Sequence, residues 1–147
     1  MSRPVLMLLS GPNLNLLGER EPEVYGSATL ADHVEAARSE ADRLGWDLEH
    51  HQSNHEGQLI DLIHSARGRC SGLIINPGAL THYSRALADA LATFEGPKVE
   101  LHLSNPAARE EWRGISVVAP VVTGTVAGFG GAGYPLAVRA LVEVGPG

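Results

Sequence analysis

The sequence predicts one α/β domain, spanning residues 1–147, in which five parallel strands form a doubly wound sheet with helices on both faces. Short apolar runs alternate with amphipathic helical patterns along the whole chain, and the apolar runs end at loops rich in Gly, Pro and Asn. The length of 147 residues suits one hydrophobic core in three layers and is too short for two independently folding units.

The first predicted strand, residues 5–9, is continuously apolar, as expected for a strand buried on both faces. A helix is predicted at residues 29–44, because apolar residues recur there every three or four positions, Thr29 and Asp32 form a capping box, and Gly45 ends the pattern. The same reasoning predicts the remaining elements in order: strand 46–51, helix 58–66, strand 72–75, helix 84–94, strand 98–103, short helix 107–112, strand 116–118 and helix 135–143.

Composition excludes several classes of protein. Apolar residues make up 44% of the chain, and its 17 glycines and 9 prolines are dispersed, which argues against disordered and collagen-like chains. A net charge of −6 argues against a nucleic-acid partner, because such binding depends on clustered Lys and Arg. No apolar run is long enough to span a membrane and no signal peptide is visible, so we expect a cytoplasmic protein without a membrane partner.

The strand at residues 98–103 has a polar face where a covered parallel strand is normally apolar. Alternation places Glu100 and His102 on one side of this strand. They can form a structural pair, or the strand can lie at the edge of the sheet. Alternatively, Glu100 orients His102 as a general acid or base, a role that the near-neutral reference pKa of histidine suits.

The loop after the first strand, residues 11–26, is longer than a strand-to-helix connection requires, and residues 18–26 are expected to act as a lid over an active site. Arg20 and Tyr25 lie five residues apart in it, and a guanidinium near a phenol favours the tyrosinate form. Tyr25 can also be a packing residue whose hydroxyl is hydrogen-bonded.

Two more segments follow strands at the same predicted edge of the sheet. Asn76 and His82 can bind hydroxyl groups of a ligand, or they can serve a turn and a solvated loop. Arg109 and Arg113, four residues apart on the short helix, can hold a carboxylate, or they can pair with the two glutamates between them.

Three other features receive structural interpretations. Residues 128–133 match the pattern G-x-G-x-x-G, but the 14 residues that follow are too few for a βαβ unit, so we predict a turn and close helix packing. The histidines at 50, 51 and 55 do not share a helix face, so no metal site is predicted. The lone Cys70 is expected to be a small residue at a helix end.

Several motifs resemble the signature of the type II 3-dehydroquinate dehydratases, a family with a flavodoxin-like fold. They agree in order and spacing over essentially the whole chain and comprise residues 11–18, 20–22, 25–26, 52–57, 76–78, 81–82, 100–105, 109–113 and 133–134. The resemblance implies a single catalytic domain that dehydrates 3-dehydroquinate to 3-dehydroshikimate through an enolate, in the shikimate pathway. It also implies that the reaction needs no metal, organic cofactor or Schiff base.

The resemblance implies a role for each matching catalytic residue. Tyr25 would be the base, Arg20 would favour its ionised form and stabilise the developing charge, and Asn13 would help to hold a water on the enolate oxygen. His102, oriented by Glu100, would be the general acid.

The substrate-binding residues implied in the same way are Asn76, His82, Leu103, Ser104, Arg113 and Asp89. Asp89 would reach the site of a neighbouring subunit, so trimers that assemble into a dodecamer are expected. The single lysine, Lys98, begins its strand and so lies away from the carboxyl ends, which argues against an imine mechanism. The alternative function is a flavodoxin-like module that binds a small ligand or flavin and has no lyase activity.

Overall fold

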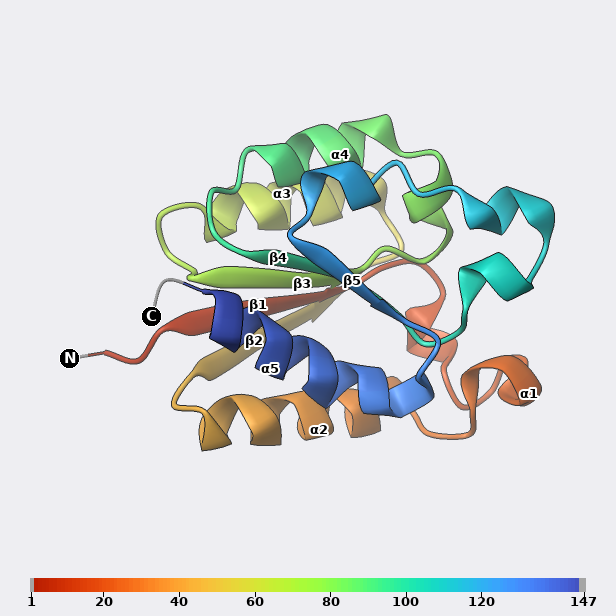
Figure 1. Cartoon of the computed structure of the whole chain (residues 1–147), viewed down its shortest axis with the longest axis horizontal. Coiled ribbons are helices and arrows are strands. Elements are labelled where there is room, and N and C mark those ends of the chain that lie inside the picture. The colour runs from red at the N-terminus through yellow and green to blue at the C-terminus, as the bar shows by residue number, and fades with distance from the viewer. Residues whose placement is uncertain (1, 146–147) are drawn as a thin grey trace.

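The computed structural model describes residues 2–145, which form a five-stranded parallel sheet between two layers of helices (Figure 1). The strands are β1 (Val5–Ser10), β2 (Asp47–Gln52), β3 (Gly72–Asn76), β4 (Lys98–His102) and β5 (Gly124–Ala127). The helices are α1 (Pro22–Tyr25), α2 (Leu30–Arg43), α3 (Glu56–Ala66), α4 (Arg85–Ala92) and α5 (Gly133–Val144). The strand order β2-β1-β3-β4-β5, with every pair parallel, confirms the predicted doubly wound, flavodoxin-like fold.

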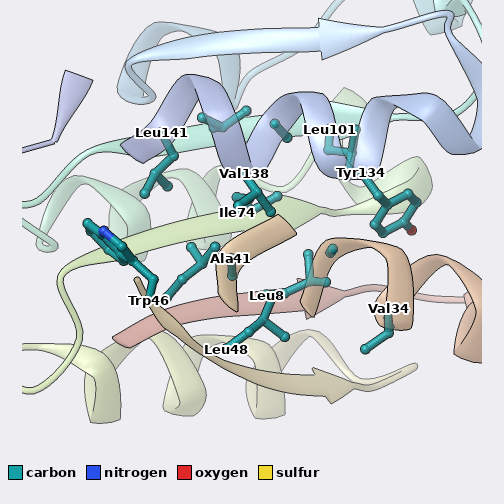
Figure 2. Packing of buried hydrophobic residues seen from close by; sticks show 14 of the residues in the cluster. Leu8, Val34, Ala41, Trp46, Leu48, Ile74, Leu101, Tyr134, Val138 and Leu141 are labelled. Atoms are coloured by element: carbon teal, nitrogen blue, oxygen red, sulfur yellow. The ribbon is translucent and has the colours of Figure 1, made fainter. Parts of the chain in front are cut away.

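Each face of the sheet has its own hydrophobic core, which explains why β1 is apolar at successive positions. Leu6 and Leu8 pack with α2 and α5, whereas Met7 and Leu9 pack with α3 and α4. Figure 2 shows the first core, in which Leu8, Ile74 and Leu101 of the sheet face residues of α2 and α5. Among residues 2–145, no helix is both long and apolar enough to cross a membrane.

The predicted ends of α2 and the interpretation of the glycine-rich segment are confirmed. The Thr29 hydroxyl accepts the Asp32 N–H, and the Asp32 carboxylate accepts the Thr29 N–H, so the capping box is complete. At the start of α5, a Cβ on Gly133 would lie 3.1 Å from Leu101 Cδ1, so glycine allows the helix to approach the sheet closely. Pro135 lies in the first turn of α5, where backbone N–H groups have no partner within the helix and proline is tolerated.

The prediction of a strand at residues 116–118 is wrong, because the last strand is β5. The Ser116 hydroxyl accepts the backbone N–H groups of Val118 and Ala119, which bends the chain into a turn. Pro120, which follows, has no N–H to donate to a neighbouring strand.

The short helix predicted at residues 107–112 is also wrong. Two 3₁₀ turns, Pro106–Ala108 and Glu111–Gly114, take its place, with Arg109 in an extended conformation between them. A six-residue helix gains few hydrogen bonds against the cost of starting it, so the contacts of Arg109 described below outweigh helix formation. Arg109 and Arg113 therefore do not share one helix face.

Candidate active site

A pocket lies where the loops after β1, β3 and β4 meet, at the carboxyl ends of the central strands. Nine of the eleven site residues predicted from the sequence line it: Asn13, Arg20, Tyr25, Asn76, His82, His102, Leu103, Ser104 and Arg113. The two that do not line it are Glu100, which lies directly behind His102, and Asp89.

Glu100 and His102 form a buried pair with 2.6 Å between Glu100 Oε2 and His102 Nε2. Because β4 lies between β3 and β5, the edge-strand interpretation of these polar residues is wrong. Glu100 is 1% exposed, and its carboxylate also accepts hydrogen bonds from the hydroxyls of Thr81 and Ser116. The polar face of β4 is therefore satisfied within the fold.

These hydrogen bonds determine the charge of Glu100. Burial alone would raise the pKa of Glu100, but the hydrogen bonds from His102, Thr81 and Ser116 outweigh burial and hold this pKa below its ordinary value. Glu100 is thus a carboxylate that accepts the Nε2–H of His102. This contact leaves Nδ1 of His102 as the ring nitrogen that can exchange a proton with a ligand in the pocket.

Tyr25, at the end of α1, lies between two arginines. Arg109 Nη1 donates to the Tyr25 hydroxyl oxygen at 2.7 Å, and the Arg109 side chain is largely buried. The Arg20 guanidinium carbon lies 4.9 Å from the centre of the tyrosine ring. Two guanidinium groups therefore lie beside the Tyr25 phenol, and the Glu21 carboxylate pairs with both of them, at 2.8 Å from Arg20 and 3.8 Å from Arg109. No sequence spacing links Arg109 to Tyr25, since 84 positions separate them.

The loop that contains Arg20 is held in place by the end of β2 and the residues that follow it. Asn13 adopts a left-handed conformation with φ of 72°, which asparagine tolerates, and its backbone N–H donates to Asn54 Oδ1 at 3.0 Å. The Gln52 amide donates to the Gly11 carbonyl at 3.2 Å and to Asn54 Oδ1 at 3.1 Å. Gln52 and Asn54 thus fix the backbone from which the Asn13 side chain faces the pocket.

Asn76 and His82 have structural hydrogen bonds and also line the pocket. Asn76 Oδ1 accepts the Gly78 N–H at 3.1 Å, as the turn interpretation requires. His82 Nδ1 lies 2.6 Å from the Ile115 carbonyl oxygen, which can only accept, so Nδ1 carries the hydrogen. Nε2 of His82 is then the ring nitrogen left for a ligand.

Three other predicted residues have clear positions. Arg113 pairs with Glu110 at 3.0 Å, as one of the two alternatives from the sequence proposed, while its side chain also lines the pocket. Asp89 lies exposed on α4, outside the pocket. Lys98 is the first residue of β4 and so lies at the amino ends of the strands, opposite the pocket. Its amine donates there to the carbonyl oxygens of Leu91 and Phe94.

The histidines near β2 do not converge. His50 Nε2 is 3.0 Å from the Ser10 hydroxyl, and His51 pairs with Glu49 at 2.8 Å. Within residues 2–145, no group of three or more His, Cys, Asp or Glu side chains is arranged to hold a metal ion.

Comparison with known proteins identifies the family. A family model described as dehydroquinase class II matches residues 4–142. The chain belongs to the class II dehydroquinase family. The 3-dehydroquinate dehydratase of Halalkalibacterium halodurans is 52% identical over 138 residues, which cover 94% of this chain and 95% of that protein. That of Bacillus subtilis is 52% identical over 140 residues, covering 95% of each.

Solved structures of class II dehydroquinases have the same fold. The crystal structure of the type II dehydroquinase from Propionibacterium acnes matches with a TM-score of 0.92 and 43% identity, covering 97% of this chain and 98% of that one. The corresponding structure from Butyrivibrio crossotus matches with a TM-score of 0.92 and 42% identity, covering 96% and 99%.

Proposed function

We propose that this class II dehydroquinase removes water from 3-dehydroquinate to give 3-dehydroshikimate by trans elimination through an enolate, in the shikimate pathway. One observation carries the proposal. A tyrosine held by two arginines and a histidine backed by a buried carboxylate, from separate loops, line the same pocket. A base and an acid in one pocket are what elimination of water next to a ketone requires.

In the first step, the Tyr25 oxygen removes a proton from the carbon next to the ketone, and the C–H electrons move to give the enolate. Arg109 and Arg20 would assist this step, because Arg109 donates to the Tyr25 oxygen and a guanidinium group stabilises negative charge next to it. Asn13 is proposed to hold a water that donates to the enolate oxygen. Stabilising the charge that develops is the main means by which an enolate is formed at neutral pH.

In the second step, the C–O bond breaks, the enolate electrons form the new double bond, and His102 protonates the departing hydroxyl as water. The proton comes from Nδ1, because Nε2–H is held by Glu100. The carboxylate of Glu100 stabilises the protonated imidazole before the transfer. Before the next turnover, Tyr25 must release the proton that it gained and His102 must regain the proton that it lost.

The remaining pocket residues are proposed to bind the substrate. Arg113 would hold its carboxylate, as guanidinium groups do, while its pairing with Glu110 fixes the side chain. Asn76, His82 and Ser104, with the Leu103 backbone, would bind the ring hydroxyls. Residues 18–26 would close over the bound substrate as a lid.

The proposal extends to the assembly and its location. Asp89 would complete the site of a neighbouring subunit, which is consistent with its exposed position on α4 away from this pocket. Trimers assembled into a dodecamer would then be the working form, in the cytoplasm.

The decisive experiment follows the ultraviolet absorbance of the conjugated enone after 3-dehydroquinate is added to the purified protein with a chelator and without added cofactor. We expect the absorbance to rise with the wild type and not with Tyr25→Phe, which should still bind substrate. No rise with the wild type would overturn the proposal. A preparation that is yellow or binds added flavin without turnover would indicate the flavin-binding alternative.

Treatment with borohydride in the presence of substrate tests the mechanism separately. An imine mechanism would leave the enzyme covalently inactivated, whereas an enolate mechanism would leave it active. We expect full activity after treatment, because Lys98 lies at the amino ends of the strands, away from the pocket.

A further inference from the structure

Ser116 stands out because its hydroxyl contacts the carboxylate behind the proposed acid, although it belongs to no motif that indicated catalysis. Ser116 Oγ lies 3.0 Å from Glu100 Oε1 and 3.1 Å from Glu100 Oε2, so it faces both carboxylate oxygens. It also lies 2.9 Å from the Thr81 hydroxyl, which donates to the same carboxylate. Ser116 therefore connects the partners of Glu100.

The hydrogen bonds to the backbone fix where the Ser116 proton points. The hydroxyl oxygen accepts the N–H of Val118 at 3.2 Å and that of Ala119 at 2.9 Å, which uses both of its lone pairs. Its single proton must then be donated, and the charged Glu100 carboxylate is a stronger acceptor than the Thr81 hydroxyl. The turn at residues 116–119 thus makes Ser116 a fixed donor to Glu100.

We propose that Ser116 is a positioning residue for the general acid: its hydroxyl holds the Glu100 carboxylate in the orientation that keeps the His102 Nδ1 proton directed into the pocket. This inference rests on the proposed function. A carboxylate held by three donors stays ionised and cannot rotate, so its contact with the imidazole keeps one geometry. Without the Ser116 hydroxyl, Glu100 would attract the proton between its Oε2 and His102 Nε2 more strongly, and its carboxylate group could rotate.

A cavity of about 190 Å³ lies on the other side of the Glu100–His102 pair, and it limits how much activity the loss of the Ser116 hydroxyl should cost. Glu100, His102 and Ser116 all line it, so water can enter when the serine side chain is shortened. Water would replace part of the lost hydrogen bond but would not hold a fixed orientation. We therefore expect Ser116→Ala to lower kcat about tenfold, less than the loss of a general acid itself, with little change in KM.

Ser84 provides a matched control. Its hydroxyl also accepts a backbone N–H, that of Leu87, and donates to a carboxylate, that of Glu56, but it does not line the pocket. Ser84→Ala should lower thermal stability by a similar amount and leave the pH dependence of kcat unchanged. Two further variants test the hydrogen-bond donor alone. Ser116→Thr keeps the hydroxyl and should retain activity. Ser116→Cys keeps the shape of the side chain with a weak donor, and its activity should lie between those of the wild type and Ser116→Ala.

The test combines turnover at several pH values with NMR titration of the His102 imidazole, assigned with a His102→Gln variant. For Ser116→Ala, both the descending limb of the kcat profile and the imidazole midpoint should move to higher pH. If neither moves more than in Ser84→Ala, the proposal is wrong. If the wild type shows no turnover, the proposed function fails, while the imidazole titration still reports whether Ser116 controls the pair. Should Ser116→Ala not fold, Ser116→Cys supplies the same comparison.

Discussion

Arg109 reaches the Tyr25 hydroxyl across 84 residues of sequence, and this contact gives the arginine a different role from the one its spacing suggested. It is one of two cations next to the proposed base, and it is the one that donates directly to the reacting oxygen. Arg109→Gln should therefore lower kcat at neutral pH by roughly a hundredfold, because a neutral amide stabilises negative charge on the Tyr25 oxygen less than a guanidinium does. The enone absorbance assay measures this loss.

Arg139→Gln is the matched control, because Arg139 is exposed on α5, pairs with Glu143 at 3.6 Å and does not line the pocket. Its activity should stay within about twofold of the wild type. A similar loss in both variants, or none in Arg109→Gln, would show that Arg109 does not act on Tyr25.

Residue types that carry recognisable chemistry could be found from the sequence when they lie near one another along the chain. Glu100 and His102 are two positions apart on one strand, and alternation alone placed them on the same face. The contacts of Arg109 with Tyr25 and of Ser116 with Glu100 could not be predicted, since the partners come from other elements of the fold. Only the folded chain brings them to Tyr25 and Glu100.

At the scale of elements, the edge strand β2 is where acid should first weaken the fold. His50 of β2 is partly buried, and burial, with help from the neighbouring His51 and Arg38, lowers the pKa of His50 to about 4. The unfolded chain binds a proton near pH 6.5 and the folded chain does not, so stability is full above pH 6.5 and falls as the pH drops towards 4. Burial lowers the pKa of His33 of α2 as well, in the same direction.

Urea unfolding at pH 7.5 and pH 5 checks this prediction. From pH 7.5 to pH 5, the free energy of unfolding of the wild type should fall by on the order of 1 kcal/mol more than that of His50→Gln, after allowance for the partial exposure of His50. His64→Gln, at an exposed position of α3, should behave as the wild type. Carboxylates do not explain a loss in this range: Arg69 and His51 lower the pKa of Glu49 to about 2, so its contribution disappears only below about pH 4.5. Equal losses in all three proteins would contradict the prediction.

Elements with a strong periodic pattern were predictable and those made by tertiary contacts were not. The four strands before residue 103 and the long helices follow from apolar patterns and caps. The two segments predicted wrongly, 107–112 and 116–118, lie beside the pocket, where side-chain contacts of Arg109 and Ser116 determine the backbone. The strand β5 was missed because its residues, Gly124–Ala127, include one glycine and one small alanine and form an edge of the sheet.

At the scale of the whole molecule, Asp89 provides a test of shared active sites. Asp89→Asn and Tyr25→Phe should each abolish or strongly reduce turnover as pure proteins. When both variants are co-expressed and purified together, some sites would combine an intact Tyr25 with an intact Asp89 from a neighbour, and part of the activity should return.

The recovered activity should appear in the fraction that sediments as the larger assembly. Co-expression of Tyr25→Phe with His102→Gln is the control, because both residues line the same pocket of one chain. A complementation no greater than in this control would mean that Asp89 does not act across subunits.

Lys98 has a practical consequence for studies of this protein. Its amine is tied to the end of α4 by two backbone carbonyls, and burial lowers its pKa. Since it is the one lysine among 147 residues, reagents that acylate lysine have no target at the mouth of the pocket. Fluorophores or solid supports attached through this side chain would lie at the amino ends of the strands and would not block the entrance of the pocket.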